Sequence, residues 1–96
     1  MAYNDLTAIG ALRALRRAGI GVPESMSVIG FDDIDLAAWT DPPLTTVRQP
    51  TDALGRWAVE HLADLLAGVA VGDTTAPVQL EAELIVRDST AAQGTV

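Results

Sequence analysis

Three acidic side chains gather directly after a short apolar run near the middle of the sequence. Asp32 and Asp33 follow the run Met26–Phe31, and Asp35 stands two residues further along. If that run is a strand of an open α/β sheet, the first two carboxylates stand at its carboxyl end, where such sheets bind ligands. A carboxylate there can accept two hydrogen bonds from neighbouring hydroxyls of a sugar, and the alternative is a solvated loop with a helix-capping role. Both interpretations stay open from these residues alone.

The same acidic cluster offers a possible metal site, because three carboxylates suit a hard cation such as Mg2+. The spacing of Asp32, Asp33 and Asp35, however, fits no complete calcium loop, and no glycine stands where that loop needs one. A solvated acidic loop is therefore favoured over a metal site.

A second polar pair, Asn4 and Asp5, stands at the start of a helical pattern. An amide both donates and accepts hydrogen bonds, which suits a ligand rich in hydroxyls. The same two residue types are good helix N-caps, and the local sequence by itself favours capping.

The remaining reactive residue types give little sign of catalysis. The single histidine, His61, lies on the apolar stripe of a predicted helix, which is typical of a packed residue at the edge of a core. No serine stands in a nucleophile-elbow context, and no glycine loop suited to phosphate is present. Cysteine is absent, which excludes a disulfide, a thiolate nucleophile and a cysteine zinc site. We therefore predict no catalytic residue, no metal ligand and no cofactor, and a protein that is not an enzyme.

Trp39 follows the acidic cluster in a long loop. If its side chain is exposed, it could anchor a partner protein or stack against a sugar ring. A tryptophan that folds back onto a small core fits the sequence equally well.

Apolar periodicity predicts two helices that position these residues. The first spans about Asp5–Ala18 and ends at Gly19, and the second runs from Thr51, its expected N-cap, to Gly68. The stripes are Leu6, Ile9, Leu12 and Leu15 in the first helix, and Leu54, Trp57, Ala58, His61, Leu62, Leu65 and Leu66 in the second.

Two short segments are predicted as strands, namely Met26–Phe31 and Leu44–Val47, and a third, Val78–Val86, is predicted as one strand or a broken pair. Their alternation with the two helices indicates an α/β sheet. A buried parallel strand needs neighbours on both sides, yet the chain opens on a helix cap with no strand before it. The sheet is therefore expected to be incomplete, and residues 91–96 are expected to form a frayed tail.

The formal net charge of −7 argues against nucleic-acid binding by these residues and against an anionic membrane surface. No apolar run approaches membrane-spanning length, and the first ten residues lack the basic and apolar regions of a signal peptide. Neutral polar ligands and other proteins remain as partners.

Short motifs along nearly the whole chain resemble those of one protein family, the LacI/GalR transcriptional regulators. The succession of VIGFDD and PPLTTVRQP is the most specific part of this resemblance. The matching residues are Asn4 to Gly10, Gly19, Val22-Pro23, Ser27 to Asp33, Pro42 to Val47, Gln49-Pro50, Gly55 and Arg87 to Thr90.

The resemblance implies an α/β fold that is an incomplete part of a two-lobed, parallel-sheet domain of the periplasmic-binding-protein-like type I. Residues 1–90 would be the truncated C-terminal portion of the effector-binding domain. The helix-turn-helix head, the hinge helix and most of the first lobe would lie outside the chain. DNA would be contacted only through that missing head, no membrane would be involved, and the protein would work in the bacterial cytoplasm.

The resemblance also implies roles for individual residues. Asn4 and Asp32 match family positions that contact a sugar-like effector, and Gln49 is a weaker candidate at the crossover between the lobes. Thr51 stands where some relatives place an aromatic ring against the ligand, so we expect no stacking there. The positions that match the family's dimer interface are Ile9, Trp39 and Thr40. The implied function is effector binding and dimerisation within a regulator of transcription.

Three other functions compete with this one. The first is a fragment of a periplasmic sugar-binding transport protein, which shares the fold and the asparagine–aspartate pair. The second is a metal-dependent enzyme built on the acidic cluster. The third is a non-functional product of a truncated gene, whose folding depends on association.

Overall fold

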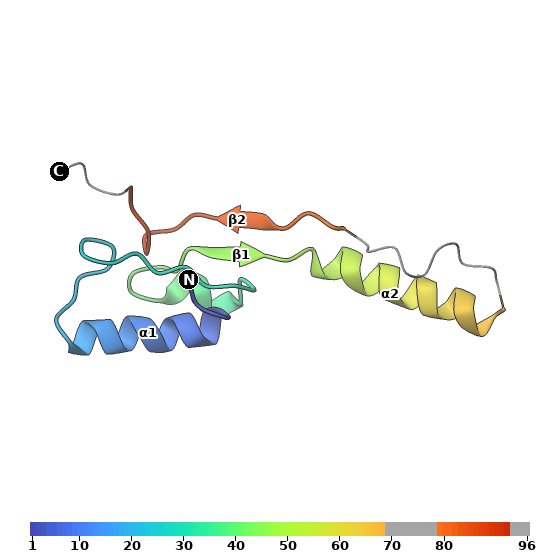
Figure 1. Ribbon diagram of the computed structural model, residues 1–96, viewed down its shortest axis with the longest axis horizontal. Helices are drawn as coiled ribbons and strands as arrows, with labels where there is room; N and C mark the ends of the chain where they lie inside the picture. The colour runs from blue at the N-terminus through green and yellow to red at the C-terminus, as the bar shows by residue number, and fades with distance from the viewer. Residues whose placement is uncertain (69–78, 93–96) are drawn as a thin grey trace. The chain divides into compact units, whose positions relative to one another are not determined.

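The computed structural model describes residues 1–68 and 79–92 (Figure 1). The chain divides into two compact units, which are described separately below. Unit 1 comprises Met1–Gln49 together with Glu83–Val96, and unit 2 comprises Pro50–Ala82. Most of the predicted tail, residues 93–96, lies outside the described residues.

Unit 1 begins with helix α1, Asp5–Arg17. The Asn4 side chain accepts a 2.8 Å hydrogen bond from the backbone N–H of Thr7, which satisfies one of the free donors of the first turn. The helix ends at Arg17 with Ala18 as its C-cap, and Gly19 follows at a φ of 74°, a left-handed conformation that glycine adopts without a Cβ clash. The predicted helix is confirmed to within one residue.

The buried face of α1 differs from the predicted stripe. Asp5, Ala8 and Leu12 are buried, whereas Leu6 is exposed. The three buried residues recur at helical spacing. In the first two turns, the buried positions therefore lie one residue earlier than the predicted ones. A buried hydrogen-bonded aspartate sets this orientation, and hydrophobicity alone could not have indicated it.

The core of unit 1 is small. Its buried apolar side chains come from α1, from the extended segment that follows it, from a 3-10 helix at Asp35–Trp39 and from the segment before the first strand. These residues are Ala8, Leu12, Val28, Ala37 and Leu44. The 3-10 helix lies where a loop was predicted, and it buries Ala37 while Trp39 at its end is 83% exposed.

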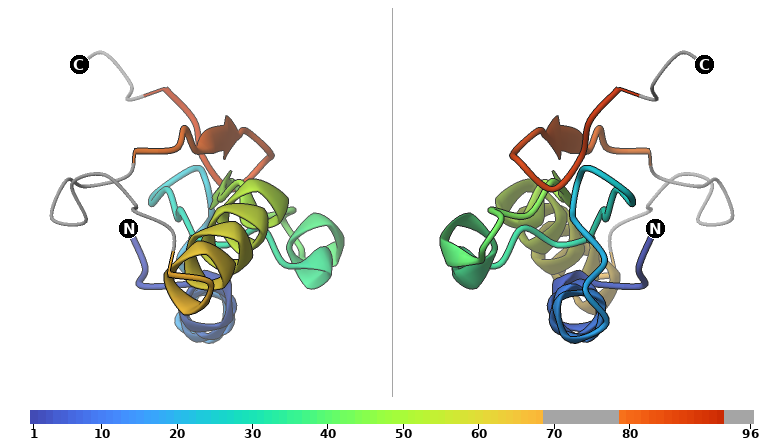
Figure 2. Two further views of the ribbon diagram at one scale, coloured as in Figure 1. Left: turned by 90° about the vertical axis from the view of Figure 1, so that its right-hand side faces the viewer. Right: turned by 90° about the vertical axis from the view of Figure 1, so that its left-hand side faces the viewer.

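Two strands of unit 1 form a short sheet. Strand β1, Thr46–Arg48, pairs with β2, Glu83–Ile85, with Thr46 opposite Ile85 and Arg48 opposite Glu83. The pairing is antiparallel, so the predicted parallel sheet is not confirmed, although one parallel bridge joins Ile29 to Thr45. In the figures, α1 and β2 lie on opposite sides of β1 (Figures 1 and 2).

The segment predicted as a buried strand, Met26–Phe31, is extended but contains only that single bridge. Met26 is exposed and Val28 is buried, so the segment is only partly covered. Its backbone nevertheless has neighbours on both sides. The N–H of Ala2 donates to the carbonyl of Ile29 at 2.8 Å, and the N–H of Gly30 donates to the carbonyl of Thr45 at 2.9 Å. Residues 1–4 form no strand, as expected, and only the backbone N–H of Ala2 reaches the carbonyl of Ile29 from before the helix.

The strand expected at Val78–Val86 is shorter than predicted. Residue 78 lies outside the described residues, and only Glu83–Ile85 pairs with β1. The preceding residues have no strand geometry, because the antiparallel partner β1 extends over only three residues.

Unit 2 contains helix α2, Thr51–Leu66, close to its predicted bounds. Pro50 occupies the N-cap position, and Thr51 is the first helical residue, so the predicted threonine cap is wrong. Pro50 makes no side-chain hydrogen bond to the first turn of the helix. Within α2 the rings of Trp57 and His61 stack, with centroids 5.0 Å apart and planes 13° apart.

None of the residues of α2 is buried, which corrects the expected placement of its apolar stripe in a core. Gly68 follows the helix at a φ of 74°, as predicted for its end. No helix in the described part of the chain is long and apolar enough to cross a membrane.

Candidate functional site

A cavity of about 790 Å3 opens beside the N-terminal end of α1, within unit 1. We call it the N-terminal pocket. It contains all three side chains that were predicted to contact an effector, Asn4, Asp32 and Gln49. These residues come from the helix cap, the end of the extended segment and the residue after β1. The full lining is Met1, Ala2, Tyr3, Asn4, Phe31, Asp32 and Gln49.

Asn4 is placed by its role as the cap of α1. Its Oδ1 atom accepts the hydrogen bond from Thr7, so the cap uses the oxygen of the amide and not its nitrogen. The next residue anchors the helix to the rest of the pocket, because the N–H of Asp5 donates to the carbonyl of Phe31 at 2.9 Å. Capping and ligand contact are therefore compatible functions of this asparagine.

The side chain of Asp5 is fully buried and lies beneath the pocket. Its Oδ1 accepts a hydrogen bond from the hydroxyl of Thr46, and its Oδ2 accepts one from the backbone N–H of Ile34 at 2.8 Å. Gly30 makes room for this carboxylate, since a Cβ atom there would lie 2.2 Å from Asp5 Oδ1. Sequence analysis treated Asp5 only as a possible cap. The available signal was that a helix has one N-cap, so one of the two polar residues needed a different role.

Asp32 is exposed on the pocket, and its backbone has an unusual conformation. Its φ is 120°, and that of Asp33 is 55°, values that residues with a side chain rarely adopt. The Gln49 side-chain nitrogen donates a 2.8 Å hydrogen bond to Asp32 Oδ1. The backbone N–H of Asp32 donates to the carbonyl of Val47 at 2.9 Å. Carboxylate and amide thus form one polar pair in the pocket.

Asp33 has a different environment from Asp32. Its side chain is only 6% exposed, with Oδ2 at 2.8 Å from Arg48 Nε and Oδ1 at 2.8 Å from the Arg87 guanidinium. Burial raises the pKa of Asp33, but the hydrogen bonds and positive charges of Arg48 and Arg87 outweigh it and hold the pKa below its ordinary value. Arg87 also donates to the carbonyl of Leu44 at 2.9 Å. We call Asp33, Arg48 and Arg87 the Asp33 cluster.

This arrangement bears on the metal hypothesis. Both carboxylate oxygens of Asp33 are engaged by arginines, and Asp35 begins the 3-10 helix. Within residues 1–68 and 79–92, no group of three or more histidine, cysteine, aspartate or glutamate side chains is placed to hold a metal ion.

Two aromatic residues of the N-terminal pocket were not singled out from the sequence. Tyr3 is 87% exposed and Phe31 is partly buried, and both line the cavity. Each immediately precedes a predicted contact, Asn4 in one case and Asp32 in the other. An aromatic face beside polar groups suits the mixed apolar and hydroxyl surfaces of a sugar ring.

The predicted dimer positions lie on another face of unit 1. Ile9 and Thr40 line a shallow cavity of about 190 Å3, and the exposed Trp39 immediately precedes Thr40. The Thr40 hydroxyl donates to the carbonyl of Pro42 at 2.9 Å, which fixes the turn that follows the 3-10 helix. Ile9 and Thr40 thus share one cavity and are both partly buried, whereas the neighbouring Trp39 exposes its ring to solvent.

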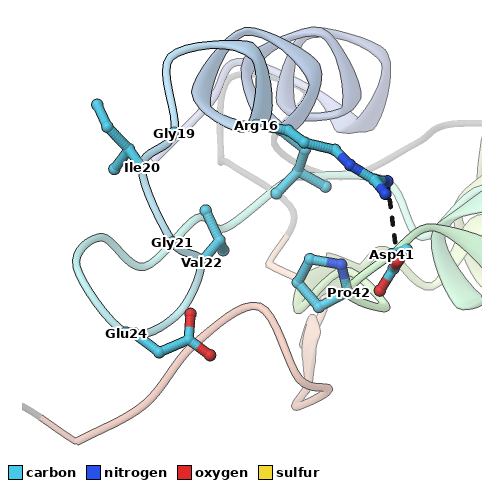
Figure 3. Close-up of a pocket in the computed structure, with 9 residues that line it drawn as sticks. Arg16, Gly19, Ile20, Gly21, Val22, Glu24, Asp41 and Pro42 are labelled. Carbon is cyan, nitrogen blue, oxygen red and sulfur yellow. Dashed lines mark ion pairs between the residues drawn. The ribbon is translucent and has the colours of Figure 1, made fainter.

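A further cavity, of about 310 Å3, lies at the C-terminal end of α1 (Figure 3). We call it the C-terminal pocket. Its wall includes the loop from Gly19 to Val22, and an ion pair of 3.8 Å joins Arg16 to Asp41 at its edge. Both charged side chains are strongly exposed, and none of the predicted effector residues lies here. We assign it no ligand.

The comparisons with known proteins agree on one family. The model of the periplasmic binding protein-like domain matches residues 1–90. The transcriptional regulator MalR of Streptomyces coelicolor, an HTH-type protein, is 48% identical over 91 residues, which cover 92% of this chain and 25% of MalR. The chain thus spans about a quarter of the length of this relative. These comparisons do not confirm the expectation that this quarter is the C-terminal part of the relatives.

Solved structures give the same result. A LacI family transcriptional regulator from Arthrobacter sp. FB24, in complex with lactose, is 42% identical with a TM-score of 0.79, over 94% of this chain and 33% of that one. The lac repressor dimer bound to operator and the anti-inducer ONPF is 37% identical with a TM-score of 0.82, over 94% of this chain and 30% of that one. The folds match, and the named relatives are transcriptional regulators rather than enzymes.

Proposed function

Because the chain belongs to the periplasmic binding protein-like domain family, we propose that it is part of a LacI-type transcriptional regulator and contributes to the binding of a sugar-like effector. The N-terminal pocket is the observation that carries this proposal. It combines two amides, a carboxylate and two aromatic rings in one cavity of about 790 Å3. A volume of this order suits a small ligand.

The chemistry of the pocket favours a neutral ligand rich in hydroxyls. Asp32 accepts hydrogen bonds, whereas the amides of Asn4 and Gln49 can donate as well as accept. Among the described residues that line the cavity, none has a basic side chain that could pair with a phosphate or a carboxylate ligand. The lactose complex of the Arthrobacter regulator supports a sugar as the class of ligand.

We propose residues 1–90 as the contributing segment and the face of Ile9, Trp39 and Thr40 as a self-association surface. The dimeric state of the operator-bound lac repressor supports this role. DNA would be contacted by a helix-turn-helix outside these residues, because the chain itself carries a net charge of −7. A regulator of this kind would act in the cytoplasm without catalysing a reaction.

Titration of the isotopically labelled 96-residue chain with lactose and with glucose, followed by NMR, tests the pocket directly. We expect saturable shifts at Asn4, Asp32 and Gln49, with weak affinity. Asp32→Asn keeps the size of the side chain but removes its charge, and should weaken binding roughly tenfold, the value of one charge-assisted hydrogen bond. Asp41→Asn is the matched control and should bind like the unmodified chain. Shifts that are absent, or that Asp32→Asn leaves unchanged, would refute the proposal.

A further inference from the structure

We propose that Asp33 is a positioning residue for the N-terminal pocket: held between Arg48 and Arg87, it fixes the backbone that presents Asp32 and Gln49 to the ligand. This inference rests on the proposed function, because it assigns the Asp33 cluster a role in that same pocket. It gives the second aspartate of the motif a task distinct from that of the first.

The cluster joins three segments that are distant in sequence. Asp33 lies two residues after the extended segment Met26–Phe31, Arg48 is the last residue of β1, and Arg87 follows β2. One carboxylate engages both arginines, with one oxygen for each, at 2.8 Å. Because the aspartate is almost fully buried, removing its charge would leave the two arginines without their shared partner in a partly dehydrated site.

The cluster and the pocket use consecutive residues of the same two segments. Arg48 donates to Asp33, and the next residue, Gln49, donates to Asp32, both at 2.8 Å. Two successive side chains at the end of β1 therefore hold two successive aspartates. A shift of the backbone at Asp33 must be transmitted to Asp32 across a single peptide bond.

The backbone at these aspartates needs such support. Positive φ values at Asp32 and Asp33 persist only where surrounding contacts enforce them. The N–H of Asp32 is held by Val47, and the N–H of Asp33 lies 3.4 Å from the Thr46 hydroxyl, a long hydrogen bond. The carboxylate of Asp33, with two hydrogen bonds of 2.8 Å to arginines, is thus a side-chain restraint on this turn. Without it, the turn can relax toward φ < 0, which moves the Asp32 carboxylate relative to Gln49.

The test uses Asp33→Asn in the 96-residue chain, with Asp41→Asn as a control of equal charge change at an exposed ion pair. The first measurement needs no ligand. The three-bond coupling between the amide and α protons of Asp32 reports φ, and the side-chain amide signals of Gln49 report its bond to Asp32. We expect both to change in Asp33→Asn and neither to change in Asp41→Asn. A folded Asp33→Asn chain with both signals unaltered would overturn the inference.

The second measurement is the affinity for lactose, which should fall roughly tenfold in Asp33→Asn although Asp33 does not line the pocket. If Asp33→Asn does not fold, Arg48→Met provides the same test, since it removes one of two partners and half of the Arg48 side chain is already exposed. Arg48→Lys, which keeps the charge, should restore much of the Asp32 coupling that Arg48→Met loses. Equal couplings in these two variants and the unmodified chain would refute the positioning role.

The two proposals can fail separately. An unmodified chain that binds no sugar rejects the proposed function, while the Asp32 and Gln49 signals of the variants still decide whether Asp33 positions the turn. Sugar binding that Asp33→Asn leaves unchanged rejects only the positioning role.

Discussion

The two ends of α1 hold polar groups in opposite ways. At the N-terminal end, Asp5 and Asp33 are buried, and each bonds to partners from distant segments. At the C-terminal end, the charges of Arg16 and Asp41 meet at 3.8 Å on the surface (Figure 3). Buried bonded carboxylates are strong restraints, whereas exposed ion pairs contribute little. The comparison indicates that preorganisation is concentrated beneath the N-terminal pocket.

The largest effect should come from Asp5→Ala. The substitution leaves the hydroxyl of Thr46 and the N–H of Ile34 without their acceptor in a buried position. We expect the free energy of unfolding to fall by about 3 kcal/mol. Urea denaturation followed by circular dichroism measures it. A loss no larger than that of Asp41→Ala would remove the distinction between the two ends.

Two glycine substitutions sharpen the same comparison. An alanine at Gly30 would place its Cβ 2.2 Å from Asp5 Oδ1 and 2.9 Å from a Leu44 methyl carbon, so we expect a loss of about 2 kcal/mol. Gly10 lies within α1 with open space around it, and alanine there should stabilise the chain by up to about 1 kcal/mol. Thermal melts of both variants check the opposite signs, and a stabilising Gly30→Ala would contradict the described packing.

The Asp33 cluster predicts a pH dependence. In the folded chain the pKa of the Asp33 carboxyl lies below its ordinary value of 3.8, so the contribution of this carboxylate to stability is fully present above that pH. The contribution is lost as the pH falls from about 4 through the lowered folded pKa, because over this range the unfolded chain binds a proton at Asp33 more readily than the folded chain does. Urea midpoints from pH 6 to 2.5 should therefore converge for the unmodified chain and Asp33→Asn. A constant difference across that range would exclude an electrostatic origin.

The smallest effect is expected at the C-terminal pocket. Asp41→Asn removes an exposed charge from a 3.8 Å pair and should change the free energy of unfolding by less than about 0.5 kcal/mol. Moderate salt screens this ion pair and should change the free energy of unfolding of the unmodified chain by a similarly small amount. Denaturation of both chains at low and high salt provides the measurement, and a loss above 1 kcal/mol would show that the two ends are restrained alike.

The sequence by itself determined the features that depend on near neighbours. Helix bounds followed from apolar spacing, and Asn4 and Gly19 were identified at the ends of α1, because caps and periodicity are interactions within one or two turns. The expectation that Asn4, Asp32 and Gln49 belong to one effector site came from the resemblance to a family. The structure places these three residues in one cavity, and their contact with an effector stays a prediction.

Tertiary structure alone decided what depends on distant partners. Nothing local distinguishes Asp32 from Asp33, yet one faces the pocket and the other meets arginines 15 and 54 residues away. Asp5 is buried and Leu6 exposed because the hydrogen bonds to Thr46 and Ile34 orient the helix. The strands are short and antiparallel because pairing depends on which segments meet, and hydrophobic pattern does not specify this.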